Sequence, residues 1–293
     1  MILQQVILGL RDGSLFALVA IGLVILFKTT GLLNFAYGSM GMFAAYIVFT
    51  FVVFVSTPLW LAVIIGMAFA VALGLTAERF LLRPIRHLSR SALLIITLGM
   101  LMILEGLALQ IWKQDYRQLP PLVTGRPMII RFSDIFLVIP QQDILIFWIT
   151  GFTVLGIFLY LKYTKMGLAI RATAQKEEAA RLMGIRVNTV YAFSWGLAAG
   201  LSALAAVLAA PRTQIHPSMM IDLQIHGLIA AVLGGFESIP GAIVGGLLLG
   251  IIEQLVGSYI SVELKLTFAL VVVIIVLLIK PAGILGKTSR RRV

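Results

Sequence analysis

Residues 14–27 read SLFALVAIGLVILF, an uninterrupted stretch without a charged side chain. It is the centre of an apolar run over residues 3–27, and about 20 such residues in helical form cross the hydrocarbon of a bilayer. Similar runs follow along the chain at 34–57, 59–80, 92–112, 144–161, 189–210, 241–257 and 264–280. The pattern predicts an all-α, polytopic helical membrane protein with about eight transmembrane helices, plus or minus one.

The composition indicates a chain that is solvated by lipid rather than by water. Of the 293 residues, 60% are hydrophobic and 12% are charged, whereas soluble domains carry about 25% charged residues. So few charges cannot cover the surface of a soluble enzyme. The apolar runs leave no room for a large extramembrane domain, so we expect residues 1–293 to form a single transmembrane domain.

A further apolar segment, residues 223–235, is too short to cross a bilayer as a helix. It ends at Gly234 and Gly235, and Pro240 follows, all of which interrupt helices. We therefore expect a short broken or re-entrant segment here. Two arrangements are compatible with the pattern: this segment crosses, or one of the later helices re-enters without crossing.

Clusters of basic residues indicate which loops face the cytoplasm. Most of the 23 Lys and Arg residues lie in the loops 79–90 and 162–186 and in the tail from Lys280 onward. Cytoplasmic loops are enriched in Lys and Arg, so the net charge of +11 reflects membrane topology rather than nucleic-acid binding. This assignment places the N-terminus outside and the C-terminus in the cytoplasm. The proline-containing connection 113–143 is expected to form an ordered external cap with turns rather than a domain.

The second basic loop contains a helix signal of its own. Residues 176–183, KEEAARLM, are mostly strong helix formers, and Gly184 stands where a helix stop is expected. Ala179, Ala180 and Met183 recur at helical spacing and predict one small apolar face. The pattern alone allows two interpretations: a helix on the membrane surface, or a helix that docks into a groove of a cytoplasmic partner.

The spacing Glu178-Ala179-Ala180-x-x-x-Gly184 resembles the E-A-A-x-x-x-G loop of ABC importer permeases, whose short helix docks on an ATPase subunit. The sequence from Arg171 to Gly184 is similar to the version of this loop in branched-chain amino-acid permeases. The resemblance implies an ATPase-coupling loop. The residues that it assigns to this loop are Arg171, Gln175, Glu178, Ala179, Ala180, Arg181 and Gly184.

Two further motifs of the same family stand in the family's order along the chain. Asn34-Phe35-Ala36-Tyr37-Gly38 resembles the N-F-A-H-G signature after the first helix, with Tyr37 in place of His and Ser39 in place of a common acid. The stretch from Gly234 to Gly241 resembles the family's G-G-x-x-S-x-x-G-P/A region. Together the motifs extend the resemblance over essentially the whole chain.

The resemblance implies a permease subunit of an ABC importer that carries branched-chain or related hydrophobic amino acids across the bacterial cytoplasmic membrane. Its implied partners are two cytoplasmic ATP-binding subunits, a second permease subunit that is identical or homologous, an extracytoplasmic substrate-binding protein and membrane lipids. Related permeases carry urea, short amides or monosaccharides, and these substrates are alternatives. An ion-coupled secondary carrier is another, although inverted repeats and charged mid-membrane residues are not evident.

Polar or irregular positions within the apolar segments are candidates for the substrate path, because such groups in hydrocarbon face a protein interior or a cavity. The candidates are Asn34, Tyr37, Gly38, Glu105, Gln224, His226, Gly234 and Gly235. Structural roles are the alternatives, with Asn34 as a helix cap and Glu105 as a hydrogen-bonded group. Glu253 is assigned to the external headgroup level.

Three Gly-x-x-x-Gly pairs predict close helix packing, either within the chain or between subunits. They are Gly196/Gly200, Gly241/Gly245 and Gly246/Gly250. Near the start of the chain, Arg11 and Asp12 are expected to neutralise each other as a structural pair.

No catalytic or metal-binding constellation emerges from the sequence, and cysteine is absent. Gly286-Lys287-Thr288 resembles the end of a phosphate-binding loop, but Pro281 stands where that motif needs its first glycine. We therefore expect no enzyme activity and no cofactor in this chain, with ATP bound by the partner ATPase subunits.

Overall fold

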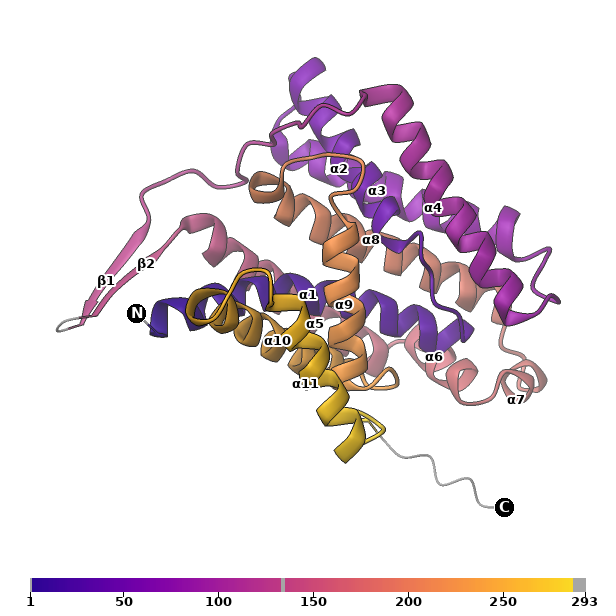
Figure 1. Cartoon of the computed structure of the whole chain (residues 1–293). Coiled ribbons are helices and arrows are strands. Elements are labelled where there is room, and N and C mark those ends of the chain that lie inside the picture. The colour runs from indigo at the N-terminus through magenta and orange to yellow at the C-terminus, as the bar shows by residue number, and fades with distance from the viewer. Residues whose placement is uncertain (1, 133–134, 287–293) are drawn as a thin grey trace. The chain divides into compact units, whose positions relative to one another are not determined.

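The computed structural model describes residues 2–132 and 135–286, and the motif residues Lys287 and Thr288 lie outside this part. Its elements are helices, one π-helical turn and one β-hairpin (Figure 1). The helices are α1 (Ile2–Thr30), α2 (Tyr37–Phe54), α3 (Leu59–Thr76), the π-helical turn η1 (Ala77–Leu82), α4 (Arg90–Trp112), α5 (Gln141–Tyr163), α6 (Lys165–Gln175), α7 (Glu177–Leu182), α8 (Val187–Thr213), α9 (Ile221–Gly234), α10 (Ile239–Tyr259) and α11 (Lys265–Ile279). The strands are β1 (Met128–Phe132) and β2 (Ile135–Ile139).

Seven of the described helices are long and apolar enough to cross a membrane: α1, α2, α3 with η1, α4, α5, α8 and α10. This confirms the predicted polytopic helical membrane protein, and seven lies within the predicted range. The run expected to span at 264–280 is α11, with only 15 residues. It ends at Ile279 because the residue that precedes Pro281 disfavours helical geometry.

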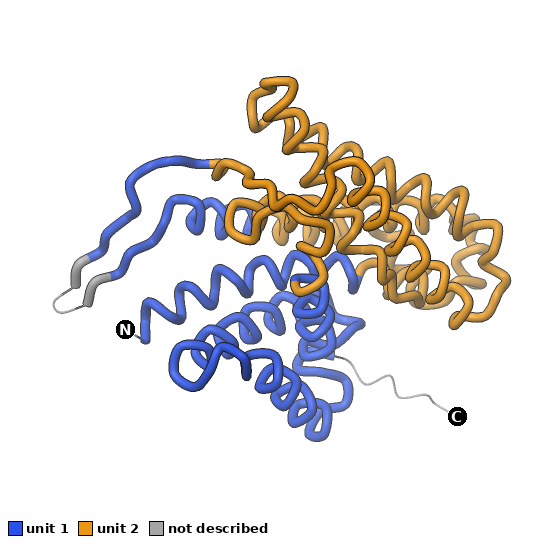
Figure 2. Tube along the Cα trace, turned by 45° about the horizontal axis from the view of Figure 1, so that its top comes forward, with its two compact units in different colours: residues 1–24, 123–151, 223–293 blue, residues 25–122, 152–222 orange. Residues whose placement is uncertain are grey.

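The chain divides into two compact units, which are coloured separately in Figure 2. Unit 1 comprises residues 1–24, 123–151 and 223–293, and unit 2 comprises residues 25–122 and 152–222. The chain passes between the units within α1, α5 and α9 and between residues 122 and 123. Each unit has its own packed interior.

The interior of unit 2 is built from α2, α3 and α8, which pack with little side-chain volume between them. A Cβ added at Gly74 would lie 2.6 Å from the carbonyl oxygen of Trp195. Gly196 and Gly200 face α3, as the Gly-x-x-x-Gly spacing predicted for packing within the chain. Lipid tails provide no hydrophobic drive between helices, so such close backbone approach supplies the van der Waals attraction instead.

Unit 1 uses the same packing between α1 and α10. Added Cβ atoms at Gly246 and Gly250 would lie within 3 Å of backbone atoms of Ala17 and Gly13. The buried Arg11 donates to Asp12 at 2.9 Å and to Asp143 of α5 at 3.2 Å. The expected Arg11–Asp12 pair is therefore present, with a second carboxylate that the sequence did not indicate.

The connection expected to form an ordered cap with turns contains a β-hairpin that the sequence analysis did not predict. β1 and β2 pair antiparallel, with Met128 opposite Ile139. The side chain of Gln4 donates to the carbonyl of Val138 at 2.9 Å and accepts from its N–H at 3.1 Å. The β-branched residues of this stretch favour strands, whereas the prolines in the same connection favour turns.

Candidate functional site

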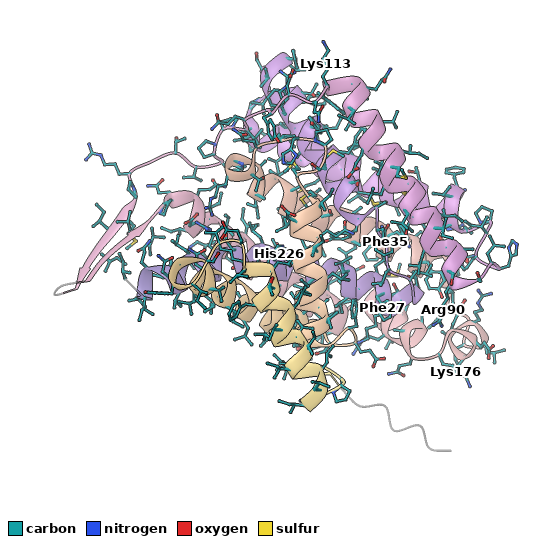
Figure 3. All side chains as sticks on the ribbon, viewed as in Figure 1. Phe27, Phe35, Arg90, Lys113, Lys176 and His226 are labelled. Carbon is teal, nitrogen blue, oxygen red and sulfur yellow. The ribbon has the colours of Figure 1, made fainter. Side chains whose placement is uncertain are left out.

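The predicted coupling loop folds as two short helices, α6 and α7, in unit 2. The hydroxyl of Thr164 accepts from the N–H of Gly167 at 2.9 Å and caps the start of α6. Lys176 is extended, with φ of −158°, and separates the two helices (Figure 3). Gly184, with φ of +81°, follows α7 in the left-handed region that favours glycine. The predicted helix and its glycine stop are therefore both present.

The faces of α7 differ from the predicted pattern. Ala180 is buried and packs against Val187 and Tyr191 at the start of α8. Ala179 is exposed, and the exposed fractions of Leu182 and Met183 are 89% and 83%. The prediction that Ala179, Ala180 and Met183 share one apolar face is therefore wrong, because only Ala180 points toward α8.

The remaining residues of the coupling loop lie at its surface. Arg171 on α6 donates to the carbonyl of Lys162 at 3.3 Å. Gln175 and Glu178 are exposed, and Arg181 pairs with Glu177 at 2.7 Å, one helical turn away. The end of α7 thus presents two exposed apolar side chains, Leu182 and Met183, among charged ones.

A buried carboxylate organises the neighbouring basic loop. Glu78 in η1 is 1% exposed and pairs with Arg83 at 2.7 Å and with Arg86. A buried carboxylate is costly unless it is paired and hydrogen-bonded, so Glu78 holds both guanidinium groups at the end of α3. Sequence reasoning missed Glu78, although a lone acid directly before the basic residues of 79–90 was a usable signal.

Arg86 extends this network to the start of α8. It donates to the Oδ1 of Asn188 at 2.9 Å, and its guanidinium carbon lies 4.1 Å from the centroid of the Tyr191 ring. Such a position over an aromatic face is attractive and is geometrically specific to a planar cation. The loop that follows η1 is therefore attached to α8.

The network continues from Tyr191 to the first residue of α7. Partial burial alone would raise the pKa of Glu177, but hydrogen bonds from Tyr191 and Arg181, with the charges of Arg181 and Arg86, bring it below its ordinary value. The carboxylate form is thus stabilised where it meets α8. Two basic loops, distant in sequence, converge on Tyr191.

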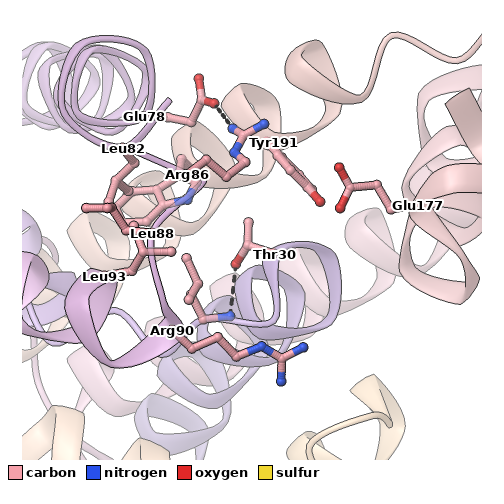
Figure 4. Close-up of a pocket in the computed structure, with 11 residues that line it drawn as sticks. Thr30, Glu78, Leu82, Arg86, Leu88, Arg90, Leu93, Glu177 and Tyr191 are labelled. Carbon is pink, nitrogen blue, oxygen red and sulfur yellow. Dashed lines mark hydrogen bonds and ion pairs between the residues drawn. The ribbon is translucent and has the colours of Figure 1, made fainter. Parts of the chain in front are cut away.

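A cavity of about 270 Å³ lies beside this network within unit 2 (Figure 4). Its lining comes from the ends of α1 and η1, the starts of α4 and α8, and the first residue of α7. The lining residues are Thr30, Leu32, Glu78, Leu82, Arg86, Leu88, Arg90, Leu93, Glu177, Tyr191 and Trp195. A second, open hollow of about 320 Å³ adjoins α7 and is lined by Arg181 and residues 185–189. The sequence did not indicate either cavity.

Three of the predicted path residues of unit 2, Asn34, Tyr37 and Gly38, lie in the turn before α2 and at the start of that helix. Asn34 is buried, and its Oδ1 accepts from the N–H of Ala36 at 2.9 Å, so it closes this turn and does not cap α2 itself. The N–H of Phe35 donates to the hydroxyl of Thr97 at 3.3 Å. Tyr37 is fully buried, and its carbonyl accepts from Ser202 at 2.7 Å.

The hydroxyl of Tyr37 is the notable atom of this turn. It is buried and has no hydrogen-bond partner within the part of the chain that the structure describes. An orphaned buried polar atom is a natural place for a water molecule or a ligand group. Gly38 follows it as a buried residue, whereas Glu105 lies further along the chain on α4 and is half-buried.

The predicted path residues of unit 1 lie on α9 and at its end. The Nε2 of His226 is 3.0 Å from the Oε1 of Glu253, and the His226 ring stacks on Phe16 with centroids 4.8 Å apart (Figure 3). Glu253 is therefore buried against α9. Gln224 lies two residues before His226 and is half-buried.

The break after α9 is satisfied by the protein itself. Gly235 has φ of +106°, and the carbonyls of Leu233 and Gly234 accept from the N–H groups of Ile284 and Leu285 at 2.9 and 3.1 Å. An added Cβ at Gly234 would lie 1.9 Å from the carbonyl oxygen of Gly241. Close backbone packing thus accounts for both glycines.

The family model "Branched-chain amino acid transport system / permease component" matches residues 5–277. The permease protein BraD of a high-affinity branched-chain amino acid transport system of Pseudomonas aeruginosa is 34% identical over 99% of this chain and 98% of its own. The corresponding protein LivH of Escherichia coli K12 is 33% identical over 99% and 97%. The ribose import permease protein RbsC of Escherichia coli K12 is 26% identical over 91% and 83%. The chain, with seven described helices that are long and apolar enough to cross a membrane, belongs to the family of permease components of branched-chain amino acid transport systems.

Proposed function

We propose that this chain is a permease subunit of an ABC importer that moves branched-chain or related hydrophobic amino acids across the bacterial cytoplasmic membrane. Its partners are two cytoplasmic ATP-binding subunits, a second permease subunit, identical or homologous, and an extracytoplasmic substrate-binding protein. ATP is bound and hydrolysed on the partner subunits. The observation that carries the proposal is the exposure of Leu182 and Met183 on α7, within the family's coupling-loop spacing.

The exposed end of α7 has the form of a docking element. Large apolar side chains on a charged surface mark sites of protein interaction, and a short helix offers them to a groove of its partner. Ala180 anchors the opposite side of α7 to Val187 and Tyr191. A displacement of α7 by an ATPase subunit is thereby transmitted to the start of α8.

The contact between the two basic loops supports the proposed topology. Arg86 of the first loop reaches Asn188 and Tyr191, and Tyr191 reaches Glu177 of the second loop. Two loops in contact lie on the same side of the membrane, which agrees with a cytoplasmic position for both. The C-terminal tail shares this side and the N-terminus faces outward. Because the chain crosses repeatedly between the two units, we assign residues 1–293 to one permease domain.

Labelling of single cysteines tests this topology, since the chain has none of its own. An impermeant thiol reagent added to intact cells should modify Val123→Cys, in the external connection, and leave Gln175→Cys unmodified. Modification of Gln175→Cys from outside would contradict the proposed orientation.

The substrate path is proposed to pass beside the turn before α2. The buried hydroxyl of Tyr37 without a protein partner supports this position. Gln224 and His226 on α9 remain candidates in unit 1, together with Glu105 in unit 2. A permease that receives its substrate from a binding protein needs little affinity of its own, which agrees with the few charged groups in its spans.

Uptake into proteoliposomes tests the function as a whole. The complete transporter, supplied with binding protein outside and ATP on the side of its ATPase subunits, should accumulate leucine, isoleucine or valine. Ribose in place of the amino acid tests the relationship to RbsC, and an imposed proton or sodium gradient without ATP tests a secondary carrier. Uptake of ribose alone, or uptake without ATP, would overturn the proposal.

A further inference from the structure

His226 and Glu253 form a buried polar pair inside unit 1. The Nε2 of His226 lies 3.0 Å from the Oε1 of Glu253, and the exposed fraction of Glu253 is 7%. The His226 ring, labelled in Figure 3, also stacks on Phe16 with the ring centroids 4.8 Å apart. Residues of α1, α9 and α10 therefore form one cluster around a single carboxylate.

The cluster lies deep along α1. Phe16 is the middle residue of this helix, which has 29 residues from Ile2 to Thr30. At 1.5 Å per residue, each end of α1 is about 21 Å from Phe16 along the helix axis, whereas half of the hydrocarbon core of a bilayer measures about 15 Å. The His226 ring that stacks on Phe16 is therefore at the depth of the hydrocarbon. Ionisable residues at this depth are costly, and they mark substrate or ion pathways.

The charge of Glu253 is incompletely compensated. Its contact with His226 has the distance of an ion pair, but Oε1 receives no hydrogen bond from the part of the chain that the structure describes. His226 is charged only when it is protonated, and no described Lys or Arg forms an ion pair with Glu253. Arg11 of α1 is already paired with Asp12 and Asp143. Because a carboxylate has about four acceptor positions, Glu253 retains capacity for a permanently cationic donor.

A primary ammonium group has the properties that this carboxylate lacks in its protein partner. It is compact, it carries a full positive charge, and it has three N–H donors. Branched-chain amino acids combine such a group with an apolar side chain, whereas a monosaccharide such as ribose has no ammonium group. A carboxylate at this position therefore distinguishes amino acids from sugars.

We propose that Glu253 recognises the ammonium group of the substrate within the membrane and is a specificity-determining residue of the permease. The inference rests on the proposed function, because the imported amino acid supplies the ammonium group. This group binds at Oε1 in place of His226, so the substrate passes between α9 and α10. His226 contacts the carboxylate when no substrate is bound.

Uptake of leucine by the complete transporter in proteoliposomes tests this role. Glu253→Gln keeps the shape of the side chain but removes its charge, and should lower initial uptake by roughly tenfold or more. ATP hydrolysis stimulated by the binding protein should be retained, and Glu253→Asp should keep part of the uptake because the charge remains. Glu263→Gln is the matched control, since Glu263 is an exposed acid of the same unit. Equal uptake by Glu253→Gln and this control would overturn the inference.

Chemical modification gives a second readout. The chain has no cysteine, so Glu253→Cys introduces one reactive thiol. During turnover, 2-sulfonatoethyl methanethiosulfonate should modify this variant and restore uptake, because it adds a negative charge. The 2-(trimethylammonium)ethyl reagent should modify it without restoring uptake. The wild-type complex, treated in the same way, controls for cysteines of the partner subunits. Absence of modification during turnover, or equal restoration by both reagents, would contradict a substrate-binding carboxylate.

The wild-type complex separates this inference from the proposed function. Wild-type import of leucine with ATP, together with unchanged uptake by Glu253→Gln, rejects the inference alone. A wild-type complex that imports no branched-chain amino acid rejects the proposed function itself.

Discussion

The guanidinium carbon of Arg86 lies 4.1 Å from the centroid of the Tyr191 ring, so the loop after α3 rests on the first turn of α8. Glu78 pairs with Arg86 from one side, and Glu177 of α7 accepts from Tyr191 on the other. A buried acid, a planar cation, an aromatic ring and the first residue of α7 thus form one connected series. Direct contacts therefore link α7 with the end of α3.

The burial of Ala180 predicts that its replacement uncouples the transporter. Ala180→Glu would place a charge against Val187 and Tyr191, which is unfavourable by several kcal/mol unless α7 moves away. We expect normal membrane insertion and a loss of most ATP-driven uptake. Ala179→Glu is the control, because Ala179 is exposed on the same helix. Equal uptake by the two variants would show that the packing of α7 on α8 does not transmit the ATPase motion.

The exposed end of α7 predicts where the ATPase subunit binds. Leu182→Ser with Met183→Ser should reduce recovery of the ATPase subunits with the permease, since two apolar contacts of about 1.5–3 kcal/mol each are removed. Leu168→Ser is the control, because Leu168 is also exposed, at 60%, but lies on α6. Co-purification measures the effect. An unchanged ratio of ATPase to permease in the double variant would place the docking surface elsewhere.

A substitution can separate the contribution of the Arg86–Tyr191 stacking from the contribution of the Arg86 charge. Arg86→Lys keeps a cation near Glu78 but loses the planar group that covers the ring. The contact is worth about 0.5–2 kcal/mol, so we expect a severalfold fall in uptake per ATP hydrolysed, measured in proteoliposomes. Arg83→Lys serves as the comparison, since Arg83 also pairs with Glu78, at 2.7 Å. A similar fall in both variants would assign the effect to the ion pairs alone.

The lowered pKa of Glu177 predicts how the attachment of α7 depends on pH. A carboxyl whose pKa is lower in the folded protein contributes stability above its ordinary value near 4.5 and loses it as the pH falls through the lowered value. The attachment should therefore be constant through neutral pH and weaken only under acidic conditions. A fluorophore on Met183→Cys reports the change, because the chain has no other cysteine. Glu177→Gln should remove the acidic transition, and an identical transition in that variant would assign it to another group.

The membrane fold was determined largely by the sequence itself. Long apolar runs have few alternatives in lipid, because every backbone polar group must be satisfied within a helix or a closed barrel. The helix α7 and its stop at Gly184 followed from local propensity and from the conformation that glycine allows. The Gly-x-x-x-Gly pairs also identified helix contacts within the chain, because only small residues allow backbones to approach so closely.

Other features depended on which residues the tertiary structure brings together. The hairpin of β1 and β2 depends on pairing between two separate strands, and the burial of Glu253 depends on His226 of a different helix. Periodicity gave Ala180 and Met183 the same face, whereas packing against α8 buries one and leaves the other exposed. The network from Glu78 to Glu177 joins residues that are far apart along the chain, and no local pattern specifies such a juxtaposition. In lipid, the sequence of a short segment is enough to make it a helix. The environment of each side chain is instead decided by the helices packed around it.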